Sequence, residues 1–143
     1  MMETYASLNR TAVDWITEIW QPGDLSGFER LHAPDFIDHS AAEGRGSDRA
    51  AYRAGIEALY AAFPDFTTLI EDLVVDPAAG LVAVRWSAAG THRGIFMEMP
   101  PTGRVIDVRG IEVIAVSGGQ ITARWGEWDL ESLLEQFQMR PGS

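Results

Sequence analysis

The sequence contains no cysteine. Disulfide frameworks, thiolate metal sites and cysteine nucleophiles are therefore excluded. The chain also has no apolar run of the length needed to cross a bilayer, and residues 1–10 lack the apolar core of a signal peptide. We therefore expect a cytoplasmic protein that does not enter a membrane.

Basic residues are scarce, since 11 Lys and Arg stand against 21 Asp and Glu, for a formal net charge of −10. Phosphate binding needs clustered Lys and Arg, so this balance argues against nucleic acid as a partner. The chain also lacks a Gly-x-Ser-x-Gly elbow, a phosphate-binding loop and a dinucleotide fingerprint. His32, Asp35, Asp38 and His39 do not have the spacing of a standard zinc site, so we expect no metal.

What remains is the composition of an ordinary globular protein, with 46% hydrophobic residues. The length of 143 residues suits a single domain, which we expect to span 1–143 with a folded core from about residue 5 to 138. A chain of this size buries roughly two-thirds of its unfolded surface. It can therefore hold one core and one pocket without covalent cross-links.

The hydrophobic period changes along the chain. Apolar residues at helical spacing predict helices over about 4–20, 25–31, 49–63 and 130–137. Alternation predicts a short extended piece at 36–39 and strands over 66–75, 81–89, 104–116 and 120–128. Most helices precede the strands, which is typical of the α+β class. We expect a curved antiparallel sheet packed on N-terminal helices.

The segment Trp125-Gly126-Glu127-Trp128-Asp129 is rich in chemistry, because it places two carboxylates and two indoles where a strand becomes a helix. Aromatic surface around a carboxyl group can raise its pKa toward neutrality, as a general acid or base requires. Glu127 is our first candidate for the base. Asp129 is a second candidate, although it stands directly before the last helix and is better suited to cap it.

The face on which these side chains lie depends on the hairpin register. A two-residue turn at Gly118-Gly119 would place Glu112 opposite Trp125. Glu112, Trp125 and Glu127 would then share one face, and mutual repulsion would raise a carboxyl pKa there. Alternation leaves open whether that face lines a pocket or meets solvent. A bulge anywhere in the hairpin would reverse the assignment.

The opposite face of this hairpin would carry Ile111, Val113 and Trp128, which are too apolar to be left bare. We therefore expect a homodimer through this outer sheet face. Other candidate site residues lie elsewhere in the chain. His92 could donate to a substrate carbonyl or fix a bend between strands, and the candidates for substrate binding are Trp125, His39, Phe96 and Trp15.

Several segments together resemble SnoaL-like polyketide cyclases. The most specific are Gly90-Thr91-His92-Arg93-Gly94 and Met99-Pro100-Pro101-Thr102-Gly103. The others are Phe36–His39, Ala62–Asp65, Gly119–Ile121, Trp125–Asp129 and the helix that carries Leu134 and Gln136. The resemblance implies a nuclear transport factor 2-like cone, a cystatin-like α+β barrel in which a curved antiparallel sheet wraps around helices and leaves a deep pocket.

The resemblance also implies a reaction. In such cyclases a pocket aspartate is the general acid–base for an intramolecular aldol closure, a histidine on the neighbouring strand assists, and no metal or cofactor takes part. Counted from the Pro-Pro-Thr turn, the aspartate position falls on Gly126 and the histidine position on Glu112. A shift of one residue would give Glu127 the role of the aspartate.

Three functions are compatible with these observations. The first is a cofactor-independent enzyme that acts on a polyketide-like or other apolar carbonyl compound by aldol cyclisation or isomerisation, with Glu127 or Asp129 as base, Glu112 as second acid and His92 on the carbonyl side. The second is a non-catalytic ligand-binding or dimerisation module of the same fold. The third is a hydroxylase variant, suggested by the missing aspartate.

Overall fold

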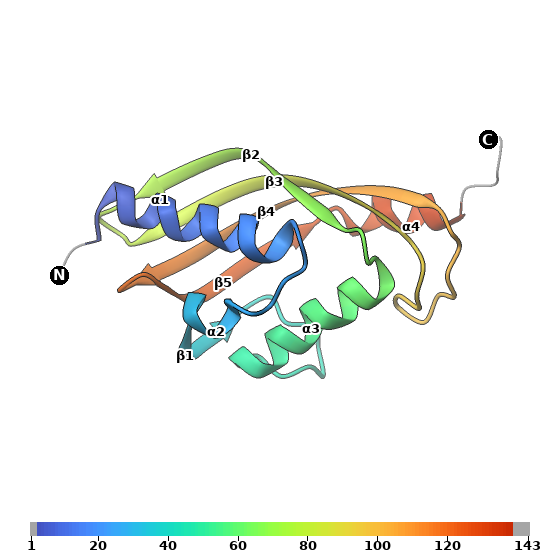
Figure 1. Cartoon of the computed structure of the whole chain (residues 1–143), viewed down its shortest axis with the longest axis horizontal. Helices are drawn as coiled ribbons and strands as arrows, with labels where there is room; N and C mark the ends of the chain where they lie inside the picture. The colour runs from blue at the N-terminus through green and yellow to red at the C-terminus, as the bar shows by residue number, and fades with distance from the viewer. Residues whose placement is uncertain (1–2, 139–143) are drawn as a thin grey trace.

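The computed structural model describes residues 3–138. Its elements are α1 (Tyr5–Asp14), η1 (Trp15–Trp20), α2 (Phe28–Leu31), β1 (His32–Asp38), α3 (Arg49–Ala62), β2 (Thr67–Asp76), β3 (Leu81–Thr91), β4 (Val105–Ser117), β5 (Gln120–Trp128) and α4 (Leu130–Gln138). Helices packed on a curved sheet confirm the predicted α+β class (Figure 1). Among these residues no helix is both long enough and apolar enough to span a membrane.

The sheet has the strand order β1-β5-β4-β3-β2. Strands β2 to β5 form an antiparallel meander, whereas β1 pairs with β5 in parallel. The sheet is therefore mixed, where a purely antiparallel one was predicted. A parallel pair needs a long connection between its strands, and here α3 and the whole meander supply it.

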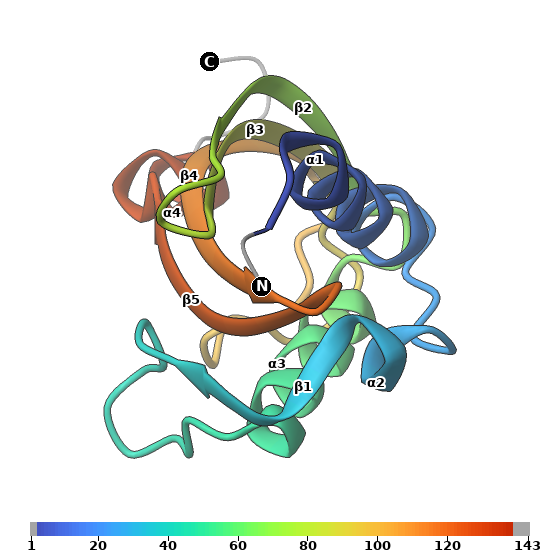
Figure 2. The same cartoon turned by 90° about the vertical axis from the view of Figure 1, so that its left-hand side faces the viewer.

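The core lies on the concave side of this sheet. Figure 2, seen along the strands, shows β2 to β5 curling into an arc, with α1 lying across the open side. Leu8, Ala12 and Ile16 pack there against inward residues of β3 and β4 such as Val84 and Ile114, all of them at most 2% exposed. Alternation along the strands and helical spacing in α1 thus meet in one apolar interior.

The first helix changes its winding at Trp15. Residues Trp15–Trp20 form a π-helix, where the sequence predicted a continuous α-helix. In an α-helix, residues five apart lie about 140° apart around the axis, so only one of the two could face the core squarely. A turn closed between residues i and i+5 brings them toward the same side. Both tryptophans are accordingly buried, at 1% and 8% exposure.

Two carboxylates cap helices, and the position of Asp129 in the sequence predicted one of these caps. Asp48 Oδ1 accepts the Ala51 N–H at 2.8 Å and caps α3. Asp129 Oδ1 accepts the Ser132 N–H at 3.1 Å, which confirms the capping role for α4. Each bond satisfies one of the amide groups left without a partner in a first helical turn.

A glycine in β4 allows the sheet to carry a tryptophan on its concave side. A Cβ at Gly110 would lie 2.5 Å from Trp86 Cζ2 and 2.6 Å from the Glu127 carbonyl oxygen. We expect Gly110→Ala to lower the free energy of unfolding by about 1–3 kcal/mol, because the strand must shift or Trp86 must leave its rotamer.

Urea unfolding followed by far-UV circular dichroism measures this effect. Gly46→Ala is the control, since its added Cβ would meet only the Ala51 Cβ at 3.2 Å in an exposed loop. The control should change stability by no more than about 0.5 kcal/mol. Equal stability of the two variants would contradict the packing described for Trp86.

Candidate active site

A β-bulge sets the direction of every side chain in the second half of the last hairpin. Gly118 and Gly119 form the predicted two-residue turn, with φ of 58° and 77°. Beyond it Val116 pairs with Ile121 but Ala115 pairs with Ala123, so Thr122 is the extra residue. Its hydroxyl donates to the Ala115 carbonyl at 3.3 Å. The register then places Gly126, not Trp125, opposite Glu112.

The predicted register was therefore wrong beyond the bulge, and the faces of β5 are exchanged. Trp125 and Glu127 lie on the convex outer face, where Trp125 is 42% exposed and Glu127 is exposed. Trp128, expected on the outer face, lies on the concave side with Arg124. Glu112 does point inward, with only 4% exposure. Glu112 and Glu127 thus do not share a face.

Glu112 belongs to a buried ionic triad drawn from three strands. Arg124 Nη2 in β5 donates to Glu112 Oε1 in β4 at 2.7 Å, and Arg124 Nη1 donates to Asp38 Oδ1 in β1 at 2.8 Å. The three residues are between 4% and 8% exposed. The guanidinium also lies over the Tyr52 ring, 5.1 Å from its centroid. Sequence reasoning did not select Arg124, and it considered Asp38 only as a metal ligand.

One cation shared by two carboxylates stabilises the ionised form of Glu112 only in part. Asp38 Oδ1 accepts a second bond, from the Ser40 N–H at 3.0 Å, whereas Glu112 Oε2 has no hydrogen-bond partner among the described residues. Burial raises the pKa of Glu112 to about 7, and Arg124 opposes the rise without cancelling it. Glu112 can therefore accept or release a proton at neutral pH.

Gly126 is required by this arrangement. A Cβ added at Gly126 would overlap Glu112 Oε2 and Arg124 Nη2. The Glu112 carboxyl group thus occupies the space into which a side chain at position 126 would project. The resemblance assigns that position to the cyclase aspartate. Here a carboxyl group reaches the same space from the neighbouring strand.

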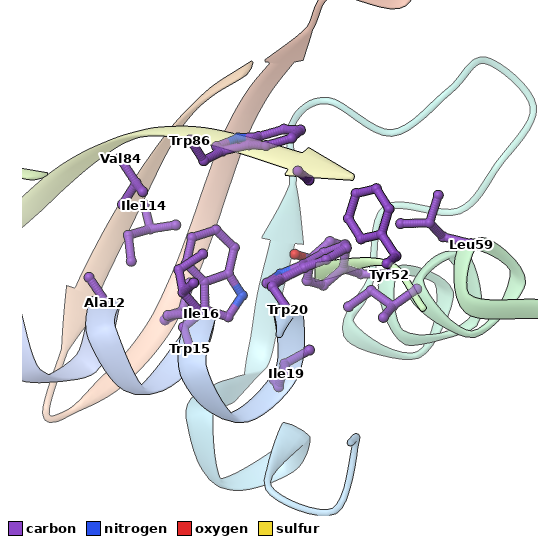
Figure 3. Packing of buried hydrophobic residues seen from close by; sticks show 14 of the residues in the cluster. Ala12, Trp15, Ile16, Ile19, Trp20, Tyr52, Leu59, Val84, Trp86 and Ile114 are labelled. Carbon is purple, nitrogen blue, oxygen red and sulfur yellow. The ribbon is translucent and has the colours of Figure 1, made fainter. Parts of the chain in front are cut away.

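Glu112 is one of the residues that line a hollow on the concave side of the sheet. The hollow is lined by Trp15, Ile16, Trp20, Thr68, Trp86, Glu112 and Trp128. Figure 3 shows Trp86 across the interior from Trp15 and Trp20. The space amounts to about 230 Å³ even when the part open to solvent is included. Ligand pockets usually measure about 300–1,000 Å³, so a ligand of several rings must displace wall side chains.

The other predicted site residues lie away from this hollow. His39 stacks on Trp125 on the outer face, with centroids 4.6 Å apart. Phe96 packs edge-on against Phe63 at 5.2 Å. His92 is fully buried and its Nδ1 accepts the Thr102 N–H at 3.2 Å. Of the predicted residues, the structure brings together only Glu112 and Trp15 at the hollow.

No group of three or more His, Asp or Glu side chains within residues 3–138 is arranged to hold a metal ion. The histidines are held in other ways. His32, for example, is stacked 4.2 Å from Phe28, its Nδ1 lies 2.8 Å from the Phe28 carbonyl oxygen, and burial lowers its pKa to about 4. His32 is thus a neutral core side chain at physiological pH.

Comparisons with known proteins agree with this architecture. A family model described as SnoaL-like polyketide cyclase matches residues 10–137. IdmH from Streptomyces antibioticus, a proposed polyketide cyclase, is 31% identical, with 92% of this chain and 99% of that chain covered and a TM-score of 0.79. A proposed polyketide cyclase from Acidithiobacillus ferrooxidans is 26% identical, covers 97% and 100%, and has a TM-score of 0.79.

AclR from Streptomyces galilaeus, a proposed hydroxylase, shares the fold with a TM-score of 0.83 at 24% identity, with 98% of this chain and 86% of that chain covered. No curated protein sequence matches the chain.

The pKa of Glu112 makes stability depend on pH. It is about 7 in the folded protein against an ordinary value of 4.5, so the folded state binds this proton more tightly. The resulting stabilisation is complete below pH 4.5 and is lost as the pH rises through 7. Glu112→Gln keeps a neutral side chain at every pH. We expect the variant to gain about 3 kcal/mol relative to wild type between the two ends of this range.

Urea unfolding of both proteins across this pH range gives the difference directly. Glu127→Gln is the matched control, because it makes the same chemical change on the exposed outer face. The control should follow the wild-type pH profile. A Glu112→Gln profile parallel to the wild type would show that Glu112 is not the group responsible.

Proposed function

Because the chain belongs to the SnoaL-like polyketide cyclase family, we propose that it is a cofactor-independent enzyme that performs acid–base chemistry on an apolar or aromatic carbonyl compound. The observation that carries this proposal is Glu112, a buried carboxyl group with a pKa near neutrality that lines a hollow walled by indoles and has one oxygen without a hydrogen-bond partner among the described residues. Such a group is suited to general acid–base catalysis at neutral pH.

The reaction needs only proton transfers and rearrangement of bonds. Ionised Glu112 removes a proton from a carbon next to the substrate carbonyl, and the electron pair of that C–H bond moves toward the oxygen to give an enolate. The enolate carbon then attacks a second carbonyl of the same molecule, or it is protonated at another position. Glu112 returns its proton to the product, so the cycle closes without a redox partner.

Two residues support Glu112 in this cycle. Arg124, bonded to Oε1, stabilises the ionised carboxylate that acts as base. Asp38, on the other side of Arg124, shares the same positive charge and raises the pKa of Glu112. Together they keep the pKa of Glu112 near neutrality, so the carboxyl group can be either ionised or protonated during the cycle.

A narrow hollow favours one alternative, a ligand-binding module of the same fold in which Glu112 only satisfies a polar group of the ligand. Such a module would bind an aromatic ketone without exchanging its protons. The hydroxylase variant is a third possibility, and oxygen consumption with an oxidisable aromatic substrate distinguishes it from both.

We also propose a homodimer through the outer sheet face. Ile111 is 52% exposed there and Trp125 is 42% exposed. Trp125 thus takes the place on this face that was expected for Trp128. Burial of this surface against a second copy would remove it from water. Light scattering at micromolar concentration should give twice the chain mass, and Ile111→Glu should restore the monomer. A monomeric wild type would contradict the dimer.

Proton exchange tests the proposed chemistry directly. The wild type should accelerate deuterium incorporation next to the carbonyl of 1-tetralone in heavy water, followed by nuclear magnetic resonance. Glu112→Gln should lower the rate by roughly 10²–10⁴-fold, the usual contribution of a general base. The wild-type rate should rise with pH around a midpoint near 7, because the ionised form is the base.

Glu127→Gln should leave the rate nearly unchanged and lower its pH midpoint only slightly, since Glu127 lies on the outer face and its charge is the smallest of the named influences on the pKa of Glu112. Full exchange in Glu112→Gln would rule out Glu112 as the base. Binding of 1-tetralone by a wild type that does not accelerate exchange would favour the binding module.

A further inference from the structure

The hollow concentrates polar atoms that have no partner within the described chain. Four residues that line it carry such atoms, namely Nε1 of Trp15, Trp20 and Trp86, and Oε2 of Glu112. The side chains that carry them are between 1% and 8% exposed. A buried polar group without a hydrogen bond is costly, so four of them around one hollow indicate a binding site rather than packing alone.

The π-helical turn gathers two of these groups. Trp15 and Trp20 are its first and last residues, and both line the hollow that Glu112 enters. In the view of Figure 3, the indole nitrogens of Trp15 and Trp20 are turned toward each other, and the Tyr52 hydroxyl lies beside Trp20. π-Helical turns often occur at functional sites, and here the turn places two N–H donors at one wall.

These groups select an electron-rich oxygen atom as their ligand. An indole nitrogen only donates hydrogen bonds, and it cannot bind a cation or another donor. Burial raises the pKa of Tyr52, so its hydroxyl also keeps its proton. The indoles that line the hollow therefore offer donors, while Glu112 in the same lining supplies the base.

We propose that the N–H groups of Trp15 and Trp20 bind the substrate carbonyl oxygen on which negative charge develops when Glu112 removes the proton. This inference rests on the proposed function and specifies the ligand as an enolisable carbonyl compound held by its oxygen. As the proton moves to Glu112, the negative charge moves from the carboxylate to the oxygen, so the buried net charge stays constant. Preorganised donors stabilise that oxygen without reorganisation.

A phenolate that mimics the enolate tests the site without turnover. The probe is 4-nitrophenolate, and 4-nitrotoluene is its neutral counterpart with a methyl group in place of the oxygen. Trp15→Phe/Trp20→Phe keeps two aromatic rings and removes both donors. We expect this double variant to bind 4-nitrophenolate at least tenfold more weakly, because hydrogen bonds to a charged oxygen are strong. Binding of 4-nitrotoluene should change less than threefold, and absorbance and calorimetry measure the two affinities.

Trp125→Phe is the matched control, since it makes the same substitution on the outer face and should leave both affinities unchanged. Thermal unfolding identifies any variant whose fold is lost. In that case Trp20→Phe alone is used. Its affinity for 4-nitrophenolate should again fall more than its affinity for 4-nitrotoluene. Equal losses of affinity for both probes, or no loss for the anion, would overturn the donor site. A crystal soaked with 4-nitrophenolate in which the indole N–H groups bind only water would overturn it as well.

The pH dependence connects this site to Glu112 and separates the two proposals. Ionised Glu112 repels the anion, so wild-type affinity for the phenolate form, corrected for protonation of the probe itself, should fall as the pH rises through about 7, and Glu112→Gln should abolish this fall. If 1-tetralone exchange is lost in Glu112→Gln while the indole variants bind the anion normally, only the donor site is wrong. If Glu112→Gln exchanges normally, the proposed function is wrong whatever the indoles bind.

Discussion

One guanidinium group held between two buried carboxylates is the constraint on which the site depends. Arg124 joins β5 to Asp38 in the edge strand and to Glu112 in β4, so it also ties the parallel strand to the meander. A buried ion is costly unless it is paired, and three such ions with two acids and one base cannot all be fully compensated. The residual imbalance falls on the carboxyl oxygen with no partner. Burial raises the pKa of Glu112 to about 7, because the shared cation offsets the loss of water only in part.

The fold surrounds this ionic triad with apolar surface. Inward residues of β3 and β4 and the face of α1 and η1 make a dry interior, and the indoles of that interior become the walls of the hollow. Because the walls exclude water, the charge on Glu112 is poorly solvated and its pKa rises. The side chains that stabilise the core are therefore also those that raise the pKa of Glu112.

The architecture could be predicted from the sequence because its determinants are local and periodic. Alternation in β3 and β4, the helical spacing before Trp20 and the caps at Asp48 and Asp129 each depend on neighbours a few positions away. The site could not be predicted in the same way. Thr122 and Ala123 are compatible with either face of a strand, so alternation gives no sign of the bulge that turns Arg124 inward. The bond from Arg124 to Asp38 joins residues 86 positions apart, and its burial depends on that pairing.

The opposed pair of Glu112 and Gly126 has a consequence for how relatives of this chain are compared. An alignment column holds one residue, whereas a point in space between two paired strands can be reached from either of them. A column-by-column reading would record glycine where a cyclase has its acid and would score the chain as inactive. A comparison in space, with the partner strand included, records the Glu112 carboxyl group at this point. Aligned positions alone therefore miss a carboxyl group that the adjacent strand supplies.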